Sequence, residues 1–350
     1  MKRSRLFILS ALAASLLMAL VIPMKVQADG LPFSVSPVQS KLQRDPKESY
    51  YDVVVGAGKS TPLQTKLVNS TNKPVKVNVT VTAAQTNDNG AVDYSLSQKR
   101  DATLRHDLAD ALQGPKTVTL PAKATVTYTA TLHMPAVDGL MVGALTFSPA
   151  DQGGTKTKQG QLSIVNKFQY QIAVITRNTN RTWQPKLRLQ QAQIRQDQYR
   201  NTIAVPVHNP SGTFLNQLRI EASATNQASG KHYQRTQKDM QMAPNSHFYY
   251  RLALPQNAQA GKYEVTTKAY YVKDPSGKYV AADGTHYQYA RTQKSAATLT
   301  AAKARQLNRK IQQAKGGTPW FVYAIFGVIG VLVLIIIALV VVLVKKRHKQ

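Results

Sequence analysis

Short runs in which apolar and polar side chains alternate recur along the middle of the chain. In the clearest run, Val75, Val77, Val79 and Val81 are separated by lysine, asparagine and threonine. A period of two places all four valines on one face of a β-strand. Further alternating runs cover residues 126–134, 162–174, 203–207, 218–224, 248–254 and 263–271. Because Gly, Pro and Asn turns separate these short strands, the pattern predicts an all-β fold built from antiparallel sandwiches.

The two halves of this region repeat one another weakly. Each half has a strand ending in Asn, a later strand introduced by Pro and a further strand introduced by Gly. The matching pairs are Leu67-Val68-Asn69 with Val207-His208-Asn209-Pro210, Leu120-Pro121 with Ala243-Pro244, and Asp138-Gly139 with Ala260-Gly261. We therefore predict two tandem immunoglobulin-like β-sandwich domains, over residues 29–160 and 161–290.

The first half carries an extra segment, roughly Ser97 to Gln113, whose leucines have helical spacing. Leu104, Leu108 and Leu112 recur every four residues, with Asp101 as a candidate N-cap and Gly114 as a stop signal. The pattern predicts a helix that covers one edge of the first sandwich.

Both ends of the chain contain long apolar runs. A basic start, an apolar stretch and the small residues around Ala28 predict a cleaved signal peptide over residues 1–28. Residues 320–344 are long enough for one transmembrane α-helix, with residues 345–350 as a cytoplasmic tail. Residues 291–319, rich in Ala, Gln and basic side chains, predict a stalk. This arrangement predicts a single-pass cell-membrane protein whose N-terminal ectodomain is extracellular, at the cell wall.

Charge is distributed unevenly between the two predicted domains. Residues 29–160 hold 14 basic and 11 acidic side chains, whereas residues 161–290 hold 16 basic and 6 acidic ones. For an exported protein, such an excess favours anionic partners outside the cell over nucleic acid. Strand alternation directs four basic residues of the second domain away from its core, and these are the candidate ligand-binding residues: Arg219, Arg251, Lys262 and Lys268.

Motifs of enzymes and metal sites are absent from the sequence. The chain has no cysteine, so it has neither disulfides nor a thiol nucleophile, and no hydrolase elbow, zincin motif or P-loop occurs. His133 and the pair Asp107 and Asp110 fit ordinary surface positions. We expect a protein that is not an enzyme and uses no cofactor or metal, with a cell-wall hydrolase as a rival hypothesis.

Short segments in both halves match the pattern of a known family. In the first half these are Phe33-Ser34-Val35-Ser36-Pro37, Tyr51–Val55 and Leu67–Val75. In the second half they are Asn166-Lys167-Phe168, Val207–Pro210, Met240–Ser246 and Ala260–Tyr263. These segments resemble the WxL-interacting proteins, a family of surface proteins of Gram-positive lactobacilli and enterococci. The resemblance covers nearly the whole chain after the signal peptide.

The resemblance implies a peptidoglycan-binding first domain and a second domain that binds a host extracellular-matrix protein such as fibronectin. It also implies association with WxL-domain surface proteins, and therefore a role in adhesion. The alternative is a fimbrial-chaperone-like assembly factor for surface proteins, since such chaperones also consist of two tandem sandwiches.

Overall fold

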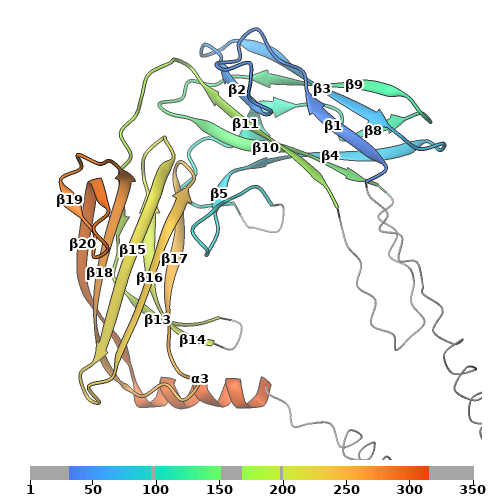
Figure 1. The fold of residues 1–350 in the computed structure, drawn as a ribbon. Coiled ribbons are helices and arrows are strands. Elements are labelled where there is room, and N and C mark those ends of the chain that lie inside the picture. The colour runs from blue at the N-terminus through green and yellow to red at the C-terminus, as the bar shows by residue number, and fades with distance from the viewer. Residues whose placement is uncertain (1–30, 96–99, 151–167, 198–199, 315–350) are drawn as a thin grey trace, which may run out of the picture.

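The computed structural model describes residues 31–95, 100–150, 168–197 and 200–314, which form two β-sandwiches set at an angle to each other (Figure 1). The alternating runs within these residues are strands with one buried face. For example, β4 (Val75–Ala83) buries Val77 and Val79 in the core of the first sandwich. The two domains are therefore built of β-strands, as the alternation of apolar and polar residues predicts.

The first sandwich consists of two sheets around one core. One sheet has the order β1 (Phe33–Pro37), β3 (Ser60–Asn69), β9 (Thr125–His133) and β7 (Leu112–Gln113). The other has the order β2 (Tyr51–Val54), β11 (Tyr170–Arg177), β10 (Met141–Pro149), β4 and β8 (Thr117–Leu120). All neighbours are antiparallel except β2 and β11. A small hairpin, β5 (Gln85–Thr86) and β6 (Val92–Asp93), projects toward the second sandwich (Figure 1).

Strand β11 lies inside the first sandwich, next to β10. The register pairs Leu145 with Ile172, and both side chains are buried in the core of the first sandwich. The expected boundary between residues 160 and 161 therefore precedes the last strand of this sandwich. The sequence does not fix this boundary, because an alternating run such as residues 162–174 can be the last strand of one sandwich or the first strand of the next.

The second sandwich also consists of two sheets. In its four-stranded sheet, β14 (Arg200–Asn209) pairs with β17 (Ser246–Ala253) on one side and with β12 (Arg188–Leu189) and β13 (Gln193–Asp197) on the other. The five-stranded sheet has the order β16 (His232–Met242), β15 (Leu215–Asn226), β18 (Gly261–Lys273), β20 (His286–Leu299) and β19 (Tyr279–Val280). The core includes Val205, Ile220, Tyr250 and Tyr263.

The expected fold class, two sandwiches followed by a stalk and a transmembrane helix, needs correction. Residues 291–299 belong to β20, and α3 (Ala301–Ala314) packs onto the second sandwich through buried Ala304 and Leu307. The composition of α3, rich in Ala and Lys, gives little sign of the narrow apolar stripe formed by Ala304 and Leu307. Among the described residues, no helix is both long and apolar enough to cross a membrane. The predicted signal peptide and the helix predicted for residues 320–344 lie outside the described residues.

The extra segment of the first domain forms a shorter helix than the leucine spacing predicts. Helix α2 covers only Leu108–Ala111, with Asp107 rather than Asp101 as its N-cap, and Leu112 already belongs to β7. Leu108 is fully buried in the core of the first sandwich, so the segment closes that core. Asp101 instead begins a turn in which it accepts hydrogen bonds from Thr103.

The weak internal repeat corresponds to a shared structural device. The Asn69 amide donates to the carbonyl oxygens of Leu120 and Pro121, and the Asn209 amide donates to that of Ala243. Each asparagine also accepts a hydrogen bond from a backbone N–H two residues later. Both asparagines are buried, so each one satisfies the polar groups of two turns at the end of its sandwich.

Candidate functional site

A cavity opens at the end of the first sandwich. Its volume is about 380 Å³, and three separate segments line it. These are residues 58–60 at the β2–β3 turn, residues 105–111 leading into and forming α2, and residues 133–141 from the end of β9 to the start of β10. Two backbone hydrogen bonds join the first and third segments, Gly58 N–H to the Met134 carbonyl and Met134 N–H to the Lys59 carbonyl. These bonds fix two of the three walls relative to each other.

The cavity combines polar and apolar lining groups. Lys59, Arg105, His106, His133, Asp107 and Asp110 supply charged or titratable side chains, while Met134, Pro135 and Met141 supply apolar surface. Ser60 Oγ lies 2.9 Å from His133 Nδ1 and fixes that ring. The Asp107 carboxylate caps α2 at Ala109 N–H, and Arg100 Nη1 lies 3.4 Å from Asp110 Oδ2. Small-molecule and glycan sites have this mixed character.

The sequence did not predict this cavity, although three of the lining residues were examined individually. His133, Asp107 and Asp110 each fit a surface position when read alone. Only the folding of three distant segments brings them together with Lys59 and His106. No local spacing in the sequence carries that information.

The four basic residues predicted as a ligand patch do not lie together. Arg219 on β15 is buried, and its guanidinium group binds the carboxylates of Glu221 and Asp283. Hydrogen bonds from Thr285 and Arg219 lower the pKa of Asp283 to about 2. Strand alternation correctly directs Arg219 out of the core, but the loop that carries Asp283 covers it. Arg219 therefore has a structural role.

Arg251 lies on the opposite sheet from the other three and reaches the first domain. Its guanidinium group lies 2.6 Å from Asp88 of the β5–β6 turn and 3.0 Å from Asp197. Lys262 and Lys268 are exposed on β18, where Glu264 stands between them and Glu221 is opposite Lys268. The predicted patch is thus reduced to two lysines among acidic neighbours.

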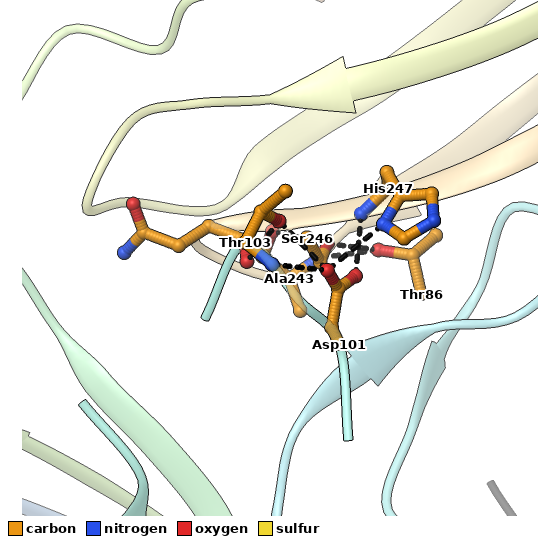
Figure 2. Close-up of polar contacts among 7 residues, drawn as sticks. Thr86, Asp101, Thr103, Ala243, Ser246 and His247 are labelled. Atoms are coloured by element: carbon orange, nitrogen blue, oxygen red, sulfur yellow. Dashed lines mark hydrogen bonds and ion pairs between the residues drawn. The ribbon is translucent and has the colours of Figure 1, made fainter. Parts of the chain in front are cut away.

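A cluster of polar contacts joins the two domains (Figure 2). Asp101 of the first domain accepts hydrogen bonds from the backbone N–H and the Nδ1 of His247 on β17, at 2.7 and 2.8 Å. This hydrogen bond raises the pKa of His247. Burial alone would raise the pKa of Asp101, but the bonds from His247 and Thr103 bring it below its ordinary value. Both shifts favour the charged form of the group concerned.

The turn between β16 and β17 inserts into the first domain beside this pair. Thr86 accepts a hydrogen bond from Ala243 N–H and lies within hydrogen-bond distance of Ser246, and Thr103 donates to the Asn245 carbonyl (Figure 2). Ala243 is fully buried against Ala84 and Val142 of the first domain. These contacts make the junction a packed interface rather than a flexible linker.

Backbones of the two domains also touch directly. A Cβ added at Gly139 would lie 2.5 Å from the Gly212 carbonyl oxygen, so neither position has room for a side chain. Gly139 has a φ of +141°, a conformation that favours glycine. The adjacent Leu140 N–H donates to the Gly212 carbonyl at 2.6 Å.

Structural comparison finds bacterial chaperones at low similarity. A Salmonella enterica SafA pilin–SafB chaperone complex matches at 12% identity and a TM-score of 0.29, covering 76% of this chain and 98% of that chain. The Pseudomonas aeruginosa CupB2 chaperone matches at 11% identity and a TM-score of 0.26, covering 70% and 96%. The E. coli chaperone DraB matches at 14% identity and a TM-score of 0.26, covering 70% and 94%. Similarity this distant carries no argument about function. A comparison with curated protein sequences finds no match.

Family profiles match both halves of the chain. The profile described as WxL Interacting Protein, peptidoglycan binding domain, matches residues 33–149. The profile described as WxL Interacting Protein, host binding domain, matches residues 159–309, which includes most of α3. Both descriptions are of binding domains, and together the matches cover most of the sequence. The chain belongs to the WxL-interacting protein family.

Proposed function

We propose that this protein is a non-enzymatic adaptor of the cell surface that binds peptidoglycan with its first domain and a host protein with its second. The match of residues 33–149 to a peptidoglycan-binding domain supports the first part. The match of residues 159–309 to a host-binding domain supports the second part. Through its first domain the protein associates with the cell wall.

The cavity of the first sandwich is the part of that domain best suited to a wall glycan. Peptidoglycan offers hydroxyl and N-acetyl groups on sugar rings, together with carboxylates on its peptides. Lys59, His106 and His133 supply hydrogen-bond donors, and Asp110 supplies acceptors for hydroxyl groups. Met134 and Met141 supply polarizable apolar surface for a ring face or an acetyl methyl group.

The family name supports a further partner, a WxL-domain surface protein. For the host-binding domain, a matrix protein such as fibronectin is the candidate that the resemblance favours. Binding either partner requires no catalytic step by this protein. The protein would act by holding a wall polymer and a protein partner at the same time.

A sedimentation assay with purified peptidoglycan tests the wall-binding part. The double variant H106A/H133A removes two donors from the cavity, and we expect it to reduce the bound fraction about tenfold, the loss of roughly two hydrogen bonds. Teichoic acids are stripped from the wall material so that charge alone cannot retain the protein.

The matched control is the variant H232A/H286A, which removes two exposed histidines from the second domain. We expect it to sediment like the wild type. Equal sedimentation of all three proteins would rule out the cavity as the peptidoglycan site. A loss in the control variant would show that histidine charge in general, rather than the cavity, retains the protein.

A further inference from the structure

The outer face of the four-stranded sheet in the second sandwich is rich in cationic side chains. In the register of this sheet, His208 is opposite both Arg188 and His247, and Thr202 is opposite both Arg195 and Ala253. Residues opposite one another in a sheet point to the same side. Since Ile203, Val205 and Val207 face the core, the side chains listed next share the outer face: Arg188, Arg195, Arg200, His208, His247, Tyr249 and Arg251.

Acidic groups neutralise only part of this face. Asp88 and Asp197 pair with Arg251, and Asp101 pairs with His247. Arg188, Arg195 and Arg200 are exposed, and among the described residues none of them forms an ion pair. These three guanidinium groups are free to bind an anionic partner. We call them, together with Tyr249, the arginine face.

Tyr249 gives the arginine face an apolar centre. The Arg195 guanidinium carbon lies 4.0 Å from the centroid of the Tyr249 ring, and His247 meets the same ring edge-on at 5.9 Å. Half-buried Tyr and exposed Arg are the residue types that dominate protein–protein binding sites. The face also adjoins the first domain through Asp88 and Asp101, so it lies on the inner side of the angle between the two sandwiches (Figure 1).

We propose that the arginine face binds an acidic, extended segment of a protein partner. Guanidinium groups pair with carboxylates through two parallel hydrogen bonds, which favours Asp and Glu side chains over a diffuse negative charge. The flat face of a sheet suits a polymer lying across several strands better than a small molecule, which would need a concave site. This inference rests on the proposed host-binding role and names the chemistry by which that domain recognises its partner.

The outer face of the five-stranded sheet is a weaker candidate. It carries Lys262, Lys268 and Lys294, which are exposed, but Glu221 and Glu264 lie among them on neighbouring strand positions. A mixed face of this kind repels and attracts an acidic segment at the same time. It therefore provides a control surface with the same number of removable cations.

The test measures binding of fluorescently labelled poly-L-glutamate to the full-length protein by fluorescence anisotropy, at about 0.05 and about 0.15 M salt. We expect the variant R188Q/R195Q/R200Q to bind about tenfold more weakly and with a smaller salt dependence, because three charge pairs are lost. The variant K262Q/K268Q/K294Q removes the same charge and should change the affinity by less than about twofold. Melting temperatures establish that both variants fold.

Equal losses in the two variants would overturn the proposal in favour of net charge, and no loss in either would overturn it outright. Heparin serves as a sulfated-glycan probe. If the arginine variant lost heparin binding but kept poly-L-glutamate binding, the partner would be a glycan and not an acidic protein segment.

Binding of fibronectin is measured separately. If the arginine face binds poly-L-glutamate but the wild type does not bind fibronectin, the choice of host partner fails while the arginine face stands.

Discussion

At the scale of single residues, the junction between the domains depends on a buried carboxylate with a histidine partner. Asp101 is 6% exposed and receives four hydrogen bonds, two from Thr103 and two from His247. His208 and Asp88 also face this pair, and the Asp88 charge helps to raise the pKa of His247. The Asp101–His247 pair stabilises the junction most when both groups are charged. The stabilisation therefore depends on pH.

This pair predicts a pH range of maximal stability. The pKa of His247 is raised, so its contribution is complete below the unfolded value of about 6.5 and is lost as pH rises through the folded pKa. The pKa of Asp101 is lowered, so its contribution is present above 3.8 and is lost as pH falls through the folded pKa. We expect the difference in melting temperature between the wild type and the variant H247Q to be largest between these limits and to decrease above about pH 6.5.

The control for this measurement is H232Q, which alters an exposed histidine on β16 whose Nδ1 lies 3.1 Å from Thr225 Oγ1. Its pH profile should follow that of the wild type. A difference in melting temperature between the wild type and H247Q that did not decrease from about pH 6 to pH 8 would contradict the role assigned to the Asp101–His247 pair.

At the scale of elements, the helix α3 changes the picture of the second domain. Its Leu307 joins the core of the sandwich, and its backbone and Asn308 bind Gln196 and Asn201. The helix thereby ties the β13–β14 hairpin to the base of the domain. A segment whose composition reads as a basic stalk is an integral part of the fold.

A single substitution in α3 tests this assignment. We expect L307A to reduce the free energy of unfolding by about 2–4 kcal/mol, because it leaves a cavity in the core. The control R305A alters an exposed position on the same helix and should change it by less than about 0.5 kcal/mol. Urea unfolding measures both values. If L307A were as harmless as R305A, the helix would not be packed on the sandwich.

The strands show what could be predicted from sequence and what could not. Runs such as Val75 to Val81 and Phe248 to Leu254 are strands with the expected buried faces, because alternation is a local property. Strand β20 was missed because its buried face uses small residues such as Ala297, whose burial only the tertiary fold determines. The outward direction of Arg219 was predicted, but its cover by the loop around Asp283 was not. The cavity was not predictable because only the tertiary fold brings its three distant segments together.

At the scale of the whole molecule, the two domains are held in one arrangement by a junction that includes the turn between β16 and β17. Ala243 and Leu140 pack across it, Asp101 binds His247, and Asp88 binds Arg251. The motif Met240–Ser246, one of the segments on which the family resemblance rests, supplies this turn. A fixed arrangement keeps the cavity that we propose for the wall glycan and the arginine face at a constant separation.

The central claim, that one molecule holds peptidoglycan and an acidic partner at separate sites, is tested by a bridging assay. Labelled poly-L-glutamate is mixed with purified, teichoic-acid-free peptidoglycan, and its sedimentation is measured with and without the protein. The wild type should carry the label into the pellet. The variant H106A/H133A should leave both protein and label in solution, whereas R188Q/R195Q/R200Q should sediment itself while leaving the label behind. The account would be contradicted if the wild type sedimented without the label, or if R188Q/R195Q/R200Q itself failed to sediment.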